Sequence, residues 1–424
     1  MKRAMTRFAW AAAFPFACGL ACSTAPAKTP ANVDGAGAET ADGEAGEELG
    51  PGSAALSPEA ASAYAAGVQA FQAGDLAGAE AQFSKAVAAD PQAYPAHTAL
   101  GMVQERRGEV TRALDSYAKA SALAPDYGPA LDARVRLLIS AGRAAEAETL
   151  VRGLAAKYPE SAAVLGAMAE VASARGDSNS AQQYAQTALK KDPDYRPAML
   201  TLARDHYRAR RLDLALYTLT AILDGYGPEN PPRDKNNADA RLLRALIFKE
   251  QNKRKAAMEE FQSVLAVRPD LVDARLHLAV YMLEAGNAAE ARPILEKALE
   301  FEPSNVLVHL NLGDAYRLLG KPKDALDHLS WVARKDAALS RTHYNLGLVY
   351  LFSTAVPGVT EEQAINQAIE SFERFKKLEP RAARGAGDDV DELIARARNK
   401  KAILEAMKEQ PAEPATQETP GGAG

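Results

Sequence analysis

The chain has 424 residues, of which 47% are hydrophobic, 25% charged and 6% aromatic, and its formal net charge is −5. A mildly acidic chain has no general attraction for nucleic acid, which argues against a nucleic-acid-binding protein. The two cysteines are Cys18 and Cys22, so the sequence beyond them has no disulfide, thiolate metal site or cysteine nucleophile. Helix-forming residues dominate and alternating strand-like runs are absent, which predicts an all-α fold.

Residues 1–21 have the layout of a secretory signal peptide. Lys2, Arg3 and Arg7 make its beginning basic, and an apolar stretch follows from Phe8 to Ala21. This stretch is too short for a comfortable transmembrane helix, which needs about 20 apolar residues. A signal peptide is removed from the mature protein, so the sequence predicts export and no contribution of this segment to the fold.

Residues 19–22 read GLAC and are followed by Ser23. This motif resembles the lipobox of bacterial lipoproteins, although Gly19 stands where leucine is usual. The resemblance implies that Cys22 is acylated and becomes the new N-terminus, and that Ser23 directs the protein to the outer membrane, facing the periplasm. Acylation would give the chain a stable membrane anchor.

Two alternatives to acylation at residue 22 remain. Cys18 is a second, weaker candidate for the acylated residue. Ordinary signal cleavage after Ala27 would instead give a soluble periplasmic protein.

Residues 22–57 contain almost no large apolar side chains. The segment carries one lysine and six acidic residues, which are Asp34, Glu39, Asp42, Glu44, Glu47 and Glu48. Such a composition cannot bury enough apolar surface to offset the entropy of ordering, so we expect a disordered tether. A flexible tether of this length reaches about 30–35 Å.

Three residue types recur with a period of 34 residues. The series are Pro91, Pro125, Pro159 and Pro193; Gly74, Gly108, Gly142 and Gly176; and Ala79, Ala113, Ala147, Ala181 and Ala215. The alanine series resumes with Ala257, Ala291 and Ala325. Agreement of three residue types in one register indicates a repeat architecture.

The second repeat shows the motif most completely, with Leu100-Gly101, Gly108, Ala113, Tyr117, Ala120 and Pro125. Its period and residues resemble the tetratricopeptide repeat (TPR) family, and the resemblance covers roughly residues 60 to 380. It implies hairpins of two helices, A and B, which stack into a right-handed α-α superhelix with helix A lining the concave surface. One hairpin cannot bury its apolar face alone, so the hairpins must stack.

The period divides residues 58–382 into about nine units. They are 60–93, 94–127, 128–161, 162–195, 196–237, 238–271, 272–305, 306–339 and 340–382. Two of them carry insertions, at 225–232 and 351–359. Residues 388–409 read as a C-terminal capping helix with an apolar stripe that includes Leu404 and Met407, and 410–424 as a disordered tail.

The sequence offers no catalytic constellation, and we expect neither enzymatic activity nor a cofactor. Motifs for phosphate binding, zinc proteases and serine hydrolases are absent. His97, His309 and His343 share one repeat position, where the resemblance implies a packing aromatic. The remaining histidines, His206, His277 and His328, have no partner at metal spacing, so no metal site is predicted.

The resemblance also implies which side chains line the concave groove and contact partner proteins. They are Arg136, Arg204, Tyr207, Arg208, Asp314, Arg317, Arg341, Tyr344 and Phe352. Arginine and tyrosine are frequent interface anchors. The alternative is that the arginines pair internally, with Glu170 or Asp205. The lysine–asparagine arrangement of carboxylate-clamp repeats is absent, since the corresponding positions hold Tyr64, Thr98, Asp132 and Gly166.

These features predict a lipid-anchored periplasmic scaffold that binds other envelope proteins through its groove and takes part in assembling an envelope machine. Gliding-motility lipoproteins are the most similar in layout, followed by secretion, pilus and outer-membrane assembly lipoproteins. The alternative is a cell-wall or polysaccharide factor whose groove binds glycan or a biosynthetic enzyme. Trp331 is the only tryptophan outside the signal segment, which makes a glycan site the weaker prediction.

Overall fold

The structure is a computed structural model that describes residues 56–379 and 389–409. These residues form helices joined by short turns, with only two isolated bridges, Gly227 to Asn230 and Val356 to Val359. The all-α, repeat-like fold expected from the sequence is confirmed. The signal segment, Cys22, most of the tether and the C-terminal tail lie outside the described residues.

The chain divides into two compact units, described here separately. The N-terminal unit contains α1 (Pro58–Gln72), α2 (Leu76–Ala89), α3 (Tyr94–Arg106), α4 (Val110–Leu123), α5 (Gly128–Ser140), α6 (Ala144–Ala155), α7 (Ala162–Ala174), α8 (Ser178–Lys191), α9 (Arg196–Arg208), α10 (Leu212–Leu223), α11 (Ala238–Glu250) and α12 (Arg254–Val267). The division falls within α13 (Val272–Glu284) and α14 (Ala288–Phe301). The C-terminal unit continues with α15 (Val306–Leu318), α16 (Pro322–Lys335), α17 (Ser340–Phe352), α18 (Glu361–Leu378) and α20 (Val390–Glu409).

Many of the helices begin at a short capping side chain or a proline. Ser57, Asp75, Ser161, Asp177 and Asn305 cap helices by accepting hydrogen bonds from backbone N–H groups of the first turn. Prolines stand in the first turn of α1, α3, α5 and α9, where their missing N–H removes no helical hydrogen bond. The prolines of the 34-residue period are a different set and lie in the turns after α2, α4, α6 and α8, where they separate one hairpin from the next.

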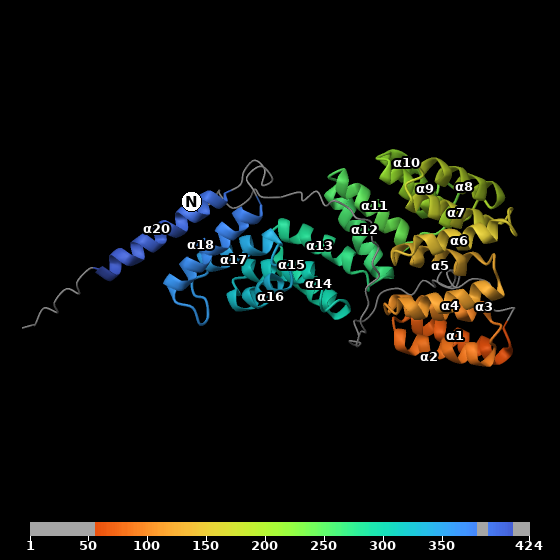
Figure 1. The fold of residues 1–424 in the computed structure, drawn as a ribbon, viewed down its shortest axis with the longest axis horizontal. Coiled ribbons are helices and arrows are strands. Elements are labelled where there is room, and N and C mark those ends of the chain that lie inside the picture. Colours follow the sequence, from red (N-terminus) through yellow and green to blue (C-terminus); the bar gives the residue numbers. More distant parts are fainter. Residues whose placement is uncertain (1–55, 380–388, 410–424) are drawn as a thin grey trace, which may run out of the picture. The chain divides into compact units, whose positions relative to one another are not determined.

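Helices A and B of one hairpin pack together closely at a glycine in helix A. A Cβ added at Gly101 would lie 2.7 Å from two ring carbons of Tyr117, and the same holds for Gly67 against Phe83. Because only glycine leaves this space, the large ring of helix B lies directly on the backbone of helix A. Figure 1 shows the resulting pairs, such as α1 with α2 and α3 with α4.

The turn between helices A and B requires a left-handed residue. Glycine occupies this place in six hairpins, with φ between 69° and 83°, at Gly74, Gly108, Gly142, Gly176, Gly286 and Gly320. At the same point of the 34-residue period, Arg210 has φ 61° and Asn252 has φ 57°. Both residues adopt a backbone conformation that non-glycine residues rarely adopt, because the repeat geometry demands it.

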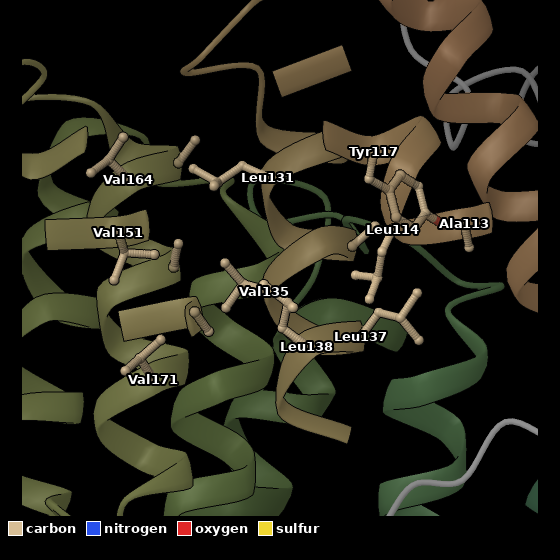
Figure 2. Packing of buried hydrophobic residues seen from close by; sticks show 14 residues of the cluster. Ala113, Leu114, Tyr117, Leu131, Val135, Leu137, Leu138, Val151, Val164 and Val171 are labelled. Atoms are coloured by element: carbon tan, nitrogen blue, oxygen red, sulfur yellow. The ribbon is translucent and has the colours of Figure 1, made fainter. Parts of the chain in front are cut away.

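The core runs from hairpin to hairpin rather than forming one centre. In Figure 2, the side chains of α5, such as Leu131 and Leu137, lie between Tyr117 of α4 and the valines Val151 of α6 and Val164 of α7. Each helix thus contributes apolar residues to both neighbours. This is the stacking that a hairpin needs to bury its apolar face.

The insertion at 225–232 forms a tight, hydrogen-bonded loop. The N–H of Tyr226 donates to the carbonyl of Asn230 (2.7 Å), and the N–H groups of Arg233 and Asp234 both donate to the carbonyl of Ile222. The ring of Tyr226 stacks on Tyr217 of α10, with 4.9 Å between the centroids. The loop is therefore fixed against helix α10.

The second insertion is also packed. Val356 is buried and pairs with Val359, whereas Phe352, at the end of α17, has 41% of its surface exposed. The apolar valines of this loop are explained by burial.

Helix α20 packs on the last hairpin through Val390, Leu393, Ile394 and Ala397. The apolar stripe expected along this helix continues to Leu404, which is partly buried against the same cluster, but not to Met407, which is 67% exposed. The sequence expectation for this residue was wrong. Here the helix lies beside the beginning of α18 through charged pairs, such as Lys408 with Glu362, and apolar packing has ended.

Candidate partner-binding surface

Successive A helices of the N-terminal unit contact one another, from α3 through α5, α7 and α9 to α11. A row of charged groups crosses this face. Arg136 of α5 pairs with Glu105 of α3 (2.9 Å), and Arg204 of α9 pairs with Glu170 of α7 (3.3 Å) and Asp239 of α11 (3.3 Å). We call these five residues the charge ladder.

Two acids of the ladder, Glu170 and Asp239, have lowered pKa values. Burial opposes the charge on Glu170, but the guanidinium of Arg204 and a hydrogen bond from Thr201 outweigh it, so the pKa of Glu170 is held below its usual value. The pKa of Asp239 is lowered for the same reason, by Arg204 and Arg136 against the effect of burial. The ladder is thus a set of paired charges, with two arginines against three carboxylates.

Asp132 lies on the same face and behaves differently. Burial raises the pKa of its carboxyl to about 7, although a hydrogen bond from the hydroxyl of Tyr195 (2.5 Å) acts in the opposite direction. The ring of Tyr195 lies against the backbone of Gly166, where an added Cβ would be 2.5 Å from it. Tyr195 therefore joins the α5 and α7 hairpins to the start of α9.

Other predicted groove residues also have internal partners. The Tyr207 hydroxyl donates to Glu250 (2.5 Å), and Arg208 donates to the carbonyl of Ser173 (2.9 Å). In the C-terminal unit, Arg317 pairs with Asp314 within one helix turn (2.6 Å).

The last three predicted groove residues lie on α17. The hydroxyl of Tyr344 donates to Asp389 (2.8 Å), at the start of the capping helix, and its ring packs on Phe375. The guanidinium of Arg396 lies 4.8 Å over the exposed ring of Phe352. Arg341 is exposed, and within the described residues it makes no ion pair.

Of the five arginines of the predicted groove, Arg136, Arg204 and Arg317 are therefore in internal ion pairs, the alternative that the sequence left open. Arg208 is held by a backbone carbonyl, and Arg341 is exposed. Glu170 is a partner, as considered, whereas Asp205 instead accepts hydrogen bonds from Ser178 and Gln182. Sequence reasoning missed Glu105 and Asp239. The sequence does carry a signal for the ladder as a whole, because Arg136, Glu170 and Arg204 are spaced by one period and alternate in charge.

The histidines that share one repeat position are structural. The Nε2 atoms of His97 and His343 bind the carbonyl oxygens six residues earlier, at Pro91 (3.0 Å) and Ala337 (3.1 Å). His309 additionally contacts His328, across the hairpin of α15 and α16. Among the described residues, no group of three or more His, Cys, Asp or Glu side chains is arranged to hold a metal ion.

Within residues 56–379 and 389–409, no helix combines the length and apolar character that a bilayer crossing requires. The predicted anchor residue, Cys22, lies outside this part of the chain.

Comparison with known proteins agrees with the fold. Two family models described as tetratricopeptide repeat match, one over residues 106–171 and 282–341, the other over 64–128, 167–231 and 242–306. Among solved structures, the APC/C hetero-tetramer Cut9-Hcn1 is similar over 80% of this chain and 76% of its own, with 15% identity and a TM-score of 0.50. A tetratricopeptide repeat protein from Parabacteroides merdae aligns over 81% of this chain and 100% of its own, with 17% identity and a TM-score of 0.29. The matched repeats span more than half of the sequence, and the chain therefore belongs to the tetratricopeptide repeat family.

Proposed function

We propose that this protein is a lipid-anchored scaffold of the bacterial envelope, which binds partner proteins in the periplasm through the face formed by its A helices. Tetratricopeptide repeats act as protein-binding scaffolds, which supports the binding role. The export signal, the motif around Cys22 and the acidic tether support the location. The partners belong to an envelope machine, such as one for gliding motility, secretion, pilus or outer-membrane assembly.

The observation that carries the binding role is the charge ladder, in which Arg136 and Asp239 stay partly exposed while Glu105, Glu170 and Arg204 are largely buried. The side chains of Arg136 and Asp239 keep 36% and 40% of their surface accessible, although both are paired. Charged groups at the rim of a surface guide association and select partners of complementary charge. The ladder can therefore recognise a partner segment that carries both signs of charge.

A photo-crosslinking experiment in living cells tests the binding role. The photoreactive amino acid p-benzoylphenylalanine is placed at Leu318, on helix A of its hairpin, or at Leu214, on helix B. These side chains are comparably exposed, at 45% and 49%. We expect discrete crosslinked proteins from Leu318 and few from Leu214. Equal patterns from both positions would argue against recognition by the A-helix face.

The anchor is tested separately by labelling cells with a clickable fatty acid. Wild-type protein should carry the label and sediment with outer membranes, whereas the Cys22→Ala variant should lose the label. A Cys18→Ala variant is the matched control and should remain labelled. Label that persists in Cys22→Ala would refute acylation at this residue, independently of the crosslinking result.

A further inference from the structure

Helix α10 and the loop that follows it carry an exposed apolar patch. Leu214 and Tyr217 of the helix are 49% and 64% exposed, and Tyr226 of the insertion is 47% exposed. They are three of the eight large hydrophobic side chains that stay exposed among the described residues. Leu214 and Tyr217 are three residues apart, so they are neighbours on the helix surface. We call Leu214, Tyr217 and Tyr226 the α10 patch.

The insertion builds part of this patch and holds it in place. The hydroxyl of Tyr226 donates a hydrogen bond to the carbonyl of Tyr217, and the two rings stack. The extra residues at 225–232 thus place a second tyrosine against the first. Rings that are already fixed lose little conformational entropy when another surface covers them, which favours binding. A contiguous exposed apolar patch of this kind marks an interaction surface.

The order of residues along α10 indicates which surface covers the patch. Arg211 is exposed and precedes Leu214 by three residues, and Tyr217 follows Leu214 by three. These side chains therefore lie in a row, with the cation and the aromatic ring on opposite sides of the leucine. Two such rows that meet antiparallel complement each other, because each guanidinium then lies over the ring of the other row.

The segments of the chain outside the described residues do not offer a better cover. Residues 410–424 contain no large apolar side chain, and residues 22–55 contain only Val33 and Leu49. Neither segment supplies enough apolar surface to bury a leucine and two tyrosines. A second copy of the chain supplies the same apolar side chains from its own patch.

We propose that the α10 patch is a homodimer interface, in which the α10 helices of two copies cross antiparallel on a two-fold axis beside Leu214. Each Leu214 then packs on its counterpart, and each Arg211 forms a cation–π contact with Tyr217 of the other copy. The interface lies on a B helix, so it is separate from the proposed binding of partners by the A-helix face. The patch is small compared with stable dimer interfaces, and we expect a dissociation constant of about 1–100 µM.

Disulfide crosslinking of the full chain tests the geometry. In a background with Cys18→Ala and Cys22→Ala, the Leu214→Cys exchange places one thiol of each copy beside the two-fold axis. Mild oxidation should therefore yield a covalent dimer. Ile403→Cys is the matched control, since Ile403 of α20 is comparably exposed at 62%, and it should stay monomeric. Adding Tyr217→Ala to Leu214→Cys should lower the dimer yield at least about tenfold.

Sedimentation velocity of the full-length protein measures the association without a crosslink. The parent protein should shift from monomer to dimer as its concentration rises, whereas Tyr217→Ala and Arg211→Glu should stay monomeric. Circular dichroism establishes that each variant is folded, and Arg211→Glu decides the question if Tyr217→Ala does not fold. A parent protein that is still monomeric at about 100 µM, or that forms species larger than dimers, would overturn the proposal.

The photo-crosslinking experiment in cells separates this proposal from the proposed function. A photoreactive residue at position 214 should capture a second copy of the chain and no other protein. Capture of a different protein at this position would overturn the homodimer. Crosslinks from Leu318 report on the A-helix face, so either proposal can fail without the other.

Discussion

The glycine contact between helices A and B gives the sharpest test of the fold. In a Gly101→Ala variant, the new methyl group would lie 2.7 Å from the Cδ1 and Cε1 atoms of Tyr117. This ring cannot easily move away, because it is fully buried and its hydroxyl donates to Glu105 (2.7 Å). The substitution therefore forces the two helices apart.

The size of the effect follows from two opposing contributions. Overpacking of a filled core destabilises by about 1–3 kcal/mol. Alanine in the middle of a helix stabilises by about 0.5–1 kcal/mol relative to glycine. We expect a net loss of about 1–2 kcal/mol for Gly101→Ala.

Gly153 is the matched control, since it lies inside helix α6 and an added Cβ meets nothing within 4 Å. Gly153→Ala should stabilise by about 0.5–1 kcal/mol. Hydrogen exchange is the preferred measurement, because repeat arrays unfold in parts and amide protection reports on each hairpin separately. Protection should fall in α3 and α4 for Gly101→Ala. Unchanged or increased protection there would refute the close contact of these helices.

Three further substitutions test the turns and the ladder. Arg210→Gly should stabilise by about 0.5–1 kcal/mol in thermal unfolding, since glycine adopts φ 61° without strain but also gains freedom in the unfolded chain. Arg204→Ala should destabilise by about 2–4 kcal/mol in urea, because the largely buried carboxylate of Glu170 loses its ion-pair partner and keeps only the hydrogen bond from Thr201. Arg152→Ala, at an exposed pair, should change stability by less than about 0.5 kcal/mol. Asp132→Asn should change the free energy of unfolding only at pH values above about 4, where the Asp132 carboxyl of the unfolded chain ionises. Burial raises the pKa of Asp132 in the folded state to about 7, above its ordinary value of 3.8, so the folded state binds more protons and wild-type stability falls from about pH 4 to 7. The variant should lose this decline, and parallel stability–pH curves would contradict the assignment.

The fold could be predicted from the sequence because the residues that the repeat geometry requires recur at fixed positions of the 34-residue period. Gly101 and Tyr117 are visible as a motif, and the structure shows why each is required. The left-handed backbone at Arg210 could not be predicted from the residue type, since arginine rarely adopts a positive φ. Only its distance from Gly176, one period away, marks the position.

The candidate site was less predictable for a physical reason. Which side chains line a groove follows from the repeat position, but which of them pair depends on side-chain reach between neighbouring hairpins. Arg204 reaches carboxylates both before and after its own hairpin, on α7 and α11. The contact of His309 with His328 similarly depends on how α15 and α16 pack, and no local motif encodes it.

The internal pairing of the ladder determines how the proposed partner would engage it. An incoming carboxylate reaches Arg204 only by displacing Glu170 or Asp239, so every new bond replaces an existing one and the net gain in free energy stays small. A partner segment without a complementary charge leaves Arg204, Glu170 or Asp239 without an oppositely charged neighbour. Such a surface distinguishes partners by charge but binds them with low affinity, which suits proteins that must be exchanged while an assembly is built.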